Sequence, residues 1–243
     1  IKLKTINYKL FGTRVWAEAG VSMATLVSAT GKLGLTGLEW AGGLPGTVGG
    51  GIRGNAGAFL GEIGDKIIEI ESMNIDNFKI KKRNRQECRF GYRQSVFKTE
   101  EGKREVVLSA KFKLQKGDQR EIKRKTQERI DYRIDRHPLD LPNIGSTFKN
   151  VNVKKVPEKV LKQFEDKIKP DPFPVLPVAK LLAGAGLKGK ITGGAMISPK
   201  HPNFIVNFNN AKAEDVKTLI SLAKKEIKEK YDIDLEEEIM IVY

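Results

Sequence analysis

Three short polar clusters carry side chains that could do chemistry or bind charge. In residues 88–98, Arg93 stands beside glycine and aromatic residues, where a guanidinium could hold a carboxylate through two hydrogen bonds. In residues 145–150, the hydroxyl of Ser146 follows a glycine. In residues 235–239, a run of three carboxylates ends at Glu238. Each cluster alone is more often a surface feature than a site, so the elements that position them must be considered.

A glycine-rich stretch, residues 42–57, is the most distinctive part of the chain, and we call it the glycine cradle. Eight of its sixteen residues are glycine, which predicts neither a helix interior nor a strong strand. Such a stretch can bring backbone N–H groups close to a flat or anionic ligand. Apolar Leu44, Val48 and Ile52 recur every four residues. This pattern indicates a shaped ligand-binding loop and not a flexible linker.

Other motifs in the sequence are incomplete. Residues 184–189 fit G-x-G-x-x-G, but they follow a helix-like segment and lack the acidic partner of a dinucleotide site. The two histidines, His137 and His201, lie near no serine or cysteine nucleophile in sequence, so a hydrolytic triad is unsupported. The single cysteine, Cys88, is expected to be a packed thiol. The sequence contains no Cys/His cluster of the kind that binds a structural zinc ion, so no metal site is predicted.

The composition is that of a globular protein with a surplus of basic residues. The chain has 243 residues, 40% hydrophobic and 30% charged, and a formal charge of +14. This charge fits a lysine-rich surface or phosphorylated small ligands. A nucleic-acid partner is not expected, because the aromatic residues fall at predicted core positions and form no stacking platform. One cysteine favours a reducing cytoplasm, and no apolar run approaches the roughly 18–20 residues of a membrane span.

The first part of the chain, 1–141, is predicted to be rich in β-structure. Ser22 is expected to cap a short helix over 23–32, and Asp118 a charged helix over 119–132. Prolines at 138 and 142 mark a predicted domain boundary. The alternation of apolar residues predicts strands at 1–6, 13–18, 66–71, 78–81 and 106–114.

The second part is predicted to alternate helices and strands. Apolar spacing predicts helices over 157–168 and 213–231 and a weaker one over 178–183. Four prolines between 170 and 177 predict an extended connector. Strands are expected at 191–197, 204–208 and 235–243. The resulting division is a first domain over 1–141, a second over 142–232 and a terminal strand over 233–243 that returns toward the active site.

Taken together and in order, these motifs resemble the family of UDP-N-acetylenolpyruvoylglucosamine reductase, the bacterial flavoenzyme also called UDP-N-acetylmuramate dehydrogenase. The resemblance covers nearly the whole chain. It rests on Gly37-Leu-Glu-Trp-Ala-Gly-Gly-Leu-Pro-Gly-Thr-Val-Gly-Gly50, Asn55-Ala-Gly-Ala58, Cys88–Lys98, Gly145–Asn150, Gly186-Leu-Lys-Gly189, Lys200-His201, Asn203-Phe-Ile-Val-Asn207 and Leu235–Ile239.

The resemblance implies an α+β fold. A β-rich flavin-binding part, like half of the vanillyl-alcohol-oxidase fold, would precede an α/β substrate-binding domain. It implies FAD as cofactor, NADPH as reductant and a UDP-sugar substrate in peptidoglycan biosynthesis in the cytoplasm. Ser146 would donate a proton, while Arg93 and Glu238 would stabilise the enol-like intermediate. Cofactor contacts would come from Gly46, Thr47, Gly49, Gly50, Asn55, Ala56 and Gly57, and substrate contacts from Tyr92, Lys149, Asn150, His201 and Asn203.

The chain departs from the family pattern at four places. A first flavin-binding segment with a G-G-G-S-N motif would precede Ile1, so we expect a truncated sequence lacking on the order of 80–100 residues by family resemblance. Phe59-Leu60 stands where the family has Tyr-Gly, and residues 151–177 are expected to be an insertion. The short segment between Val107 and Pro138 favours the compact subclass. Two alternatives stay open: a flavin-fold oxidoreductase of another substrate, and a non-catalytic basic binding module.

Overall fold

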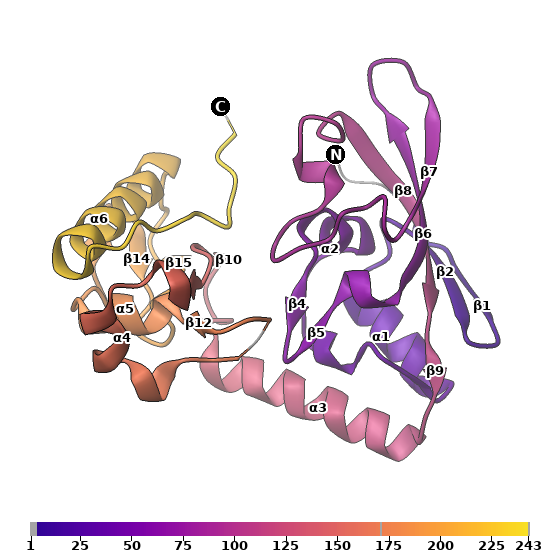
Figure 1. Cartoon of the computed structure of the whole chain (residues 1–243), viewed down its shortest axis with the longest axis horizontal. Helices are drawn as coiled ribbons and strands as arrows, with labels where there is room; N and C mark the ends of the chain where they lie inside the picture. The colour runs from indigo at the N-terminus through magenta and orange to yellow at the C-terminus, as the bar shows by residue number, and fades with distance from the viewer. Residues whose placement is uncertain (1–3, 171, 243) are drawn as a thin grey trace. The chain divides into compact units, whose positions relative to one another are not determined.

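The structure is a computed structural model that describes residues 4–170 and 172–242. The chain divides into two compact units, 1–133 and 134–243, each with its own apolar core (Figure 1). The first core centres on a sheet and two helices, and the second on a smaller sheet and its covering helices. Both units mix helices with antiparallel sheets, in agreement with the α+β class.

The first unit is built on a five-stranded antiparallel sheet in the order β1-β2-β8-β6-β7. Alternate residues of β2 and β8, among them Val15, Ala17 and Phe112, point into the core and have at most 1% of their surface exposed. The period of two therefore divides the sheet into a buried face and an open face. The strands are β1 (Tyr8–Phe11), β2 (Arg14–Glu18), β6 (Ile67–Asn74), β7 (Ile80–Asn84) and β8 (Glu105–Lys113).

Helices cover the buried face of this sheet. In α1 (Met23–Lys32), the Ser22 hydroxyl accepts from the Thr25 N–H at 2.9 Å, which confirms the predicted N-cap. The Asp118 carboxylate accepts from the Glu121 N–H at 2.8 Å at the start of α3 (Gln119–Arg136). The shorter elements are η1 (Glu39–Ala41), α2 (Val48–Gly54), η2 (Ile63–Lys66), η3 (Val96–Lys98) and the pairs β3 (Leu35–Thr36) with β9 (Gln115–Lys116) and β4 (Gly57–Ala58) with β5 (Gly61–Glu62).

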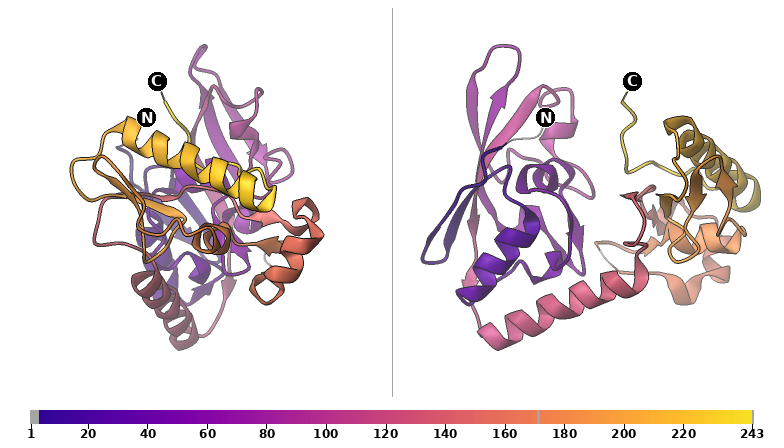
Figure 2. Two further views of the ribbon diagram at one scale, coloured as in Figure 1. Left: turned by 90° about the vertical axis from the view of Figure 1, so that its left-hand side faces the viewer. Right: turned by 180° about the vertical axis from the view of Figure 1, so that it is seen from behind.

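The second unit has a four-stranded antiparallel sheet in the order β10-β15-β14-β13. The long helix α6 (Ala213–Tyr231) packs on β13 and β14, and Figure 2 shows it lying across the strands. Residues of α6 at helical spacing, such as Leu219, Ala223 and Ile227, are buried. The strands are β10 (Asn143–Ser146), β13 (Ile191–Thr192), β14 (Ala195–Ile197) and β15 (Phe204–Asn207).

Residues 151–177, expected to be an insertion, contribute to the core of the second unit. Val151, Val156 and Val160 belong to its buried cluster, together with Leu176. β11 (Val151–Asn152) pairs with β12 (Val175–Leu176), so the ends of the segment are joined. Between and after these strands lie η4 (Val153–Lys155), α4 (Glu158–Gln163), η5 (Glu165–Lys167) and α5 (Val178–Gly184).

Several predicted elements differ from the structure. The strand predicted at 1–6 is wrong over 4–6, since the first strand begins at Tyr8, and residues 1–3 lie outside the described part. The helix predicted over 157–168 ends at Gln163 and continues as the separate turn of η5. The strand predicted over 235–243 is wrong within 235–242, which holds a single β-bridge between Phe148 and Glu237, and 243 is not described.

Candidate functional site

The glycine cradle contains a helix, which corrects the sequence prediction. Residues Val48–Gly54 form α2, although four of the seven are glycine. Val48 and Ile52 have no exposed surface and pack on β2 and β8, so tertiary burial outweighs the poor helix propensity of glycine. A Cβ on Gly49 would lie 2.8 Å from the Cβ of Ala19. The glycines therefore allow the helix to approach the sheet closely.

The hydrogen bonds of the glycine cradle show which donors remain for a ligand. The Val48 N–H donates to the Val21 carbonyl at 2.8 Å, and the Gly49 N–H to the Ala19 carbonyl at 2.9 Å. The Gly50 N–H donates to the Thr47 hydroxyl at 3.3 Å. Thus Gly49 and Gly50, predicted as cofactor contacts, use their N–H groups internally. Within the described chain, no intramolecular acceptor is shown for the backbone N–H groups of Gly43, Gly46 and Thr47.

Gly46 has the backbone conformation and the space that a ligand-binding turn needs. Its φ is +100°, a region that residues with a Cβ rarely adopt, and nothing lies within 4 Å of the position of a Cβ. The Gly46 carbonyl accepts from the Met23 N–H at 3.0 Å, so the turn is tied to the start of α1. Gly43, with φ +71°, was not among the predicted contacts. Its signal was the Gly-Gly pair that precedes Leu44 and Pro45.

Asn55 holds the end of α2 to the segment that carries Arg93. It ends α2 in the left-handed conformation and has no exposed surface. Its side-chain amide donates to the Gly91 carbonyl at 2.9 Å, and its side-chain oxygen accepts from the Gly64 N–H at 3.1 Å. Asn55 was predicted to contact the cofactor. Because it is fully buried and bonded at both ends, we assign it a positioning role.

Arg93 lies against the last residue of the glycine cradle. Its guanidinium donates to the Gly57 carbonyl at 2.9 Å and lies 5.1 Å from the ring centre of Tyr92. The backbone of Arg93 is left-handed, with φ +55°, and its carbonyl accepts from the Lys98 ammonium at 3.0 Å. Arg93, Tyr92 and residues Ala56 and Gly57 are all half-buried. The arginine is thus held in place next to predicted cofactor contacts while part of it stays accessible.

The turn at Phe59-Leu60 joins β4 and β5. Both residues have positive φ, +53° and +66°, as a two-residue hairpin with a type I′ turn requires. The Phe59 ring packs edge-on to Tyr132 at 5.1 Å, and the guanidinium of Arg129 lies 4.4 Å from its centre. These contacts with α3 stabilise a turn that two bulky residues adopt only at a cost. Leu60 is 77% exposed at the tip.

In the second unit, the clusters around Ser146 and Glu238 lie side by side. The Glu238 N–H donates to the Thr147 carbonyl at 2.8 Å, and the Lys149 N–H donates to the Glu236 carbonyl at 2.8 Å. These bonds flank the bridge between Phe148 and Glu237. The predicted proton donor and the predicted carboxylate are therefore on adjacent stretches of backbone, and both are half-buried. The hydroxyl of Ser146 has no partner among the described residues.

Asn203 holds the backbone of Thr147 and Phe148, which follow Ser146, through three hydrogen bonds. Its backbone carbonyl accepts from the Thr147 N–H at 2.8 Å. Its side-chain oxygen accepts from the Phe148 N–H at 3.0 Å, and its side-chain amide donates to the Phe148 carbonyl at 2.9 Å. Only 4% of Asn203 is exposed. It was predicted to bind substrate; in the structure its side chain holds the backbone of Phe148, next to the segment of Ser146.

Lys149 and Asn150, also predicted to bind substrate, have structural partners too. Lys149 forms an ion pair with Glu236, and 14% of its side chain is exposed. The Asn150 side chain accepts from the Val178 N–H at 3.2 Å, at the first residue of α5. Neighbouring Glu237 is paired with Lys224 of α6 at 2.7 Å. The carboxylates of the 236–237 pair therefore anchor the segment that carries Glu238.

His201 packs in an aromatic cluster with His137 and Phe204. Its ring centre lies 5.4 Å from that of His137 and 4.8 Å from that of Phe204. Burial, together with the charge of His137, lowers the pKa of His201 to about 4. The ring is therefore neutral at pH 7. Its buried Nδ1 has no partner in the described part of the chain, so it can accept a hydrogen bond from a water or a substrate hydroxyl.

In the part of the chain that the structure describes, no group of three or more His, Cys, Asp or Glu side chains is arranged to hold a metal ion. None of the described helices has the length and apolar character needed to cross a membrane. Cys88 is a buried free thiol, and burial raises its pKa to about 11, which makes it unreactive.

Comparison with known proteins identifies relatives along the whole chain. Residues 137–242 match the family model for the C-terminal domain of UDP-N-acetylenolpyruvoylglucosamine reductase. The enzyme of that name from Caldanaerobacter subterraneus subsp. tengcongensis is 37% identical over 243 residues, which are 100% of this chain and 72% of the relative. The enzyme from Clostridium novyi is 38% identical over 231 residues, 95% of this chain and 67% of the relative.

A solved structure agrees with the sequence relatives. The crystal structure of UDP-N-acetylenolpyruvylglucosamine reductase from Thermus caldophilus matches with a TM-score of 0.72 and 29% identity. The match covers 95% of this chain and 73% of that one. On this evidence, the chain belongs to the family of UDP-N-acetylenolpyruvoylglucosamine reductase.

Proposed function

We propose that this protein reduces the enolpyruvyl ether of a UDP-N-acetylglucosamine derivative to UDP-N-acetylmuramate, with FAD as cofactor and NADPH as reductant. The observation that carries the proposal is the pairing of 147–149 with 236–238. This pairing sets Ser146 and Glu238 on neighbouring backbone segments, as a proton donor and a group that stabilises developing charge would need to be. Arg93, whose guanidinium donates to the Gly57 carbonyl, would supply the cation that the same chemistry requires.

The glycine cradle suits the phosphate or isoalloxazine part of a flavin nucleotide. The N–H groups of Gly43, Gly46 and Thr47 are available donors, and the absence of a Cβ at Gly46 leaves room beside them. Gly49 contributes by letting α2 pack closely on Ala19, and Asn55 by fixing the end of α2. FAD, when bound, supplies the hydride that reduces the substrate double bond. The remaining chemistry belongs to the side chains of this protein.

The proposed reaction places a hydride on C3 and a proton on C2 of the enolpyruvyl group. As hydride arrives at C3, negative charge develops at C2 and spreads onto the substrate carboxylate. The Arg93 guanidinium would stabilise this carboxylate by a charge-assisted hydrogen bond. Glu238 would hydrogen-bond to the same enol-like group. The hydroxyl of Ser146 would then donate its proton to C2. An alcohol is a weak acid, but the carbanion-like C2 would be basic enough to take this proton.

Contacts to the rest of the UDP-sugar would come from Tyr92 and Lys149. Lys149 keeps part of its ammonium accessible beside Glu236 and could exchange this partner for a phosphate. Asn150 and Asn203 would act on the site through the backbone that they hold. His201, neutral at pH 7, would offer an acceptor and not a cation. The free buried thiol of Cys88 fits the expectation of a cytoplasmic enzyme.

The test is a comparison of Ser146→Ala with Ser221→Ala, an exposed serine of α6 in the same unit. Expressed from the complete gene and loaded with FAD, wild-type protein should oxidise NADPH when UDP-N-acetylglucosamine enolpyruvate is added. In Ser146→Ala, the reduction of the flavin by NADPH should keep its rate. The subsequent oxidation of the flavin by substrate should slow by about 10²–10⁴-fold, the usual contribution of a positioned proton donor.

Two results would contradict the proposal. Normal turnover by Ser146→Ala would remove the proton-donor role, while the reductase activity would stand. No turnover of this substrate by flavin-loaded wild-type protein would favour the alternative of another substrate for the same fold. The Ser221→Ala control should match the wild type in both half-reactions, and a loss there would indicate damage to the second unit in general.

A further inference from the structure

The open face of the five-stranded sheet carries aromatic and cationic side chains side by side. In the register of the sheet, Lys9 of β1 is paired with Trp16 of β2, and Trp16 with Lys111 of β8. The next row pairs Phe11 with Arg14, and Arg14 with Lys113. Phe11 is 65% exposed and Trp16 is half-buried. The rings thus lie at diagonal positions with basic residues around them, and we call these six residues the open-face patch.

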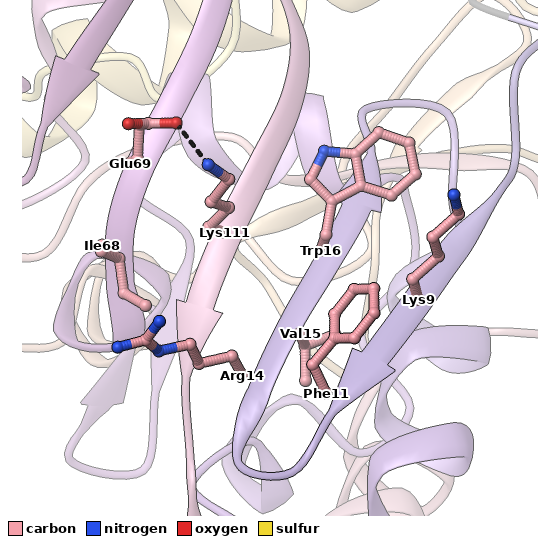
Figure 3. Close-up of a pocket in the computed structure, with 8 residues that line it drawn as sticks. All are labelled: Lys9, Phe11, Arg14, Val15, Trp16, Ile68, Glu69 and Lys111. Carbon is pink, nitrogen blue, oxygen red and sulfur yellow. Dashed lines mark hydrogen bonds and ion pairs between the residues drawn. The ribbon is translucent and has the colours of Figure 1, made fainter.

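A β-bulge adds an apolar wall to the open-face patch. Ile67 is paired with Phe112 and Glu69 with Lys111, so Ile68 is an extra residue on β6. The bulge turns the Ile68 side chain to the same face as Trp16. A shallow cavity of about 600 Å³ results, lined by both rings, Ile68 and the cations. Figure 3 shows the Trp16 indole between Lys9 and Lys111, with the Arg14 guanidinium beside Ile68.

The charge of the open-face patch is strongly positive. Of the carboxylates around the cavity, Glu69 is the one that lines it, and it is paired with Lys111 at 2.9 Å. This pairing lowers the pKa of Glu69, so it remains an anion that neutralises a single cation. Lys9, Arg14 and Lys113 are exposed basic residues. The face therefore offers flat rings at its centre and several cations at its edge.

We propose that the open-face patch binds single-stranded nucleic acid. Bases stack on exposed aromatic rings whatever their sequence, and phosphates bind the lysines and arginines that follow the strand. Diagonal neighbours in an antiparallel sheet lie about 7–8 Å apart, so Phe11 and Trp16 can each accept one of two consecutive unstacked bases. No nucleic-acid partner was expected from the sequence, because the aromatic residues fall at predicted core positions. In the structure, Phe11 is exposed and the half-buried Trp16 lines the cavity of the open face.

An acidic protein is a weaker explanation for the same surface. It would use the cations but would leave the indole of Trp16, which lines the cavity, without a specific partner. The side chains of Lys9 and Lys111 lie on either side of the indole, which lines the cavity (Figure 3). A strand of nucleotides supplies planar groups and anions in alternation, which matches the arrangement of rings and charges.

The experiment measures binding of the full chain to a fluorescein-labelled oligouridine of about ten nucleotides by anisotropy at low salt, about 50 mM. Trp16→Ala should weaken binding by about 5- to 150-fold, the loss of one stacked base. Trp16→Tyr, which keeps a ring, should restore most of it. Arg14→Gln should lower the slope of log affinity against log salt by about 0.7.

Lys123→Gln on α3, which removes one exposed cation outside the open-face patch, is the matched control and should leave the affinity and the slope unchanged. The proposal is overturned if the wild type binds more weakly than about 100 µM at low salt. It is also overturned if Trp16→Ala, folded by circular dichroism, binds like the wild type. Binding of uridine monophosphate as tight as that of the strand would make this a mononucleotide pocket and would likewise overturn it.

Discussion

Asn203→Ala should release the backbone that carries the predicted proton donor. The Asn203 side chain takes the place of a partner strand for Phe148, accepting from its N–H at 3.0 Å and donating to its carbonyl at 2.9 Å. Phe148 is 2% exposed, so water cannot replace either bond without opening the unit. Each buried group left without a partner costs about 1–3 kcal/mol, and we expect a total loss of about 2–5 kcal/mol.

Two measurements check this expectation. Urea unfolding monitored in the second unit should show the loss of stability, and hydrogen exchange should show the Phe148 amide losing its protection. Asn203→Asp is the control variant, because its carboxylate can still accept from the Phe148 N–H but cannot donate to the carbonyl. It should keep the amide protected, and because it also buries a charge beside the Phe148 carbonyl, amide protection and not stability distinguishes the two variants. The reasoning is wrong if Asn203→Ala lowers the free energy of unfolding by less than about 1 kcal/mol, or if the Phe148 amide stays protected. In either case the Asn203 side chain does not hold the backbone next to Ser146.

Three further changes test the remaining structural claims. Gly49→Ala should destabilise the protein by about 1–3 kcal/mol, because the new Cβ would lie 2.8 Å from the Cβ of Ala19. Gly50→Ala makes only ordinary contacts and should stabilise α2 by about 0.5–1 kcal/mol. Thermal unfolding should show the two opposite shifts. Asn55→Ala should cost about 2–4 kcal/mol and speed proteolysis within 88–98, and equal resistance to protease would contradict the link to Gly91. Folding lowers the pKa of His201 from 6.5 to about 4, so the stability present above pH 6.5 should be lost as the pH falls toward 4, by about 3 kcal/mol at most. His201→Phe should remove this part of the pH dependence of stability. An unchanged pH profile in that variant would contradict the assignment.

The sequence was informative where local chemistry and burial agree. The cap at Ser22 predicts α1, and the apolar stripe of α6 predicts its bounds, because both depend on residues close together in the chain. The alternation in β2 and β8 also predicts these strands. The clusters around Ser146 and Glu238 were found as separate motifs. Their side-by-side arrangement could not be derived, because it depends on pairing between residues about ninety positions apart.

The misses came from tertiary contacts that propensity does not contain. The glycines of α2 predict a loop, but burial of Val48 and Ile52 forms a helix there. The segment 235–242 is apolar enough for a strand, yet residues 147–149 offer it only one bridge. The ligand contacts predicted for Asn55 and Asn203 from motif alone stay predictions. Their side chains face backbone groups that only the folded chain brings near.

The composition of α2 has a consequence for the order of folding. Four glycines in seven residues oppose helix formation by about 1 kcal/mol each relative to alanine, so α2 cannot persist before its docking surface exists. The carbonyls of Ala19 and Val21 that receive its first N–H groups must be in place beforehand. The glycine cradle is therefore a late-folding segment with low local stability. A ligand held by Gly46 and Thr47 would act as its folding template, and slower amide exchange across 48–54 would report the ligand's arrival.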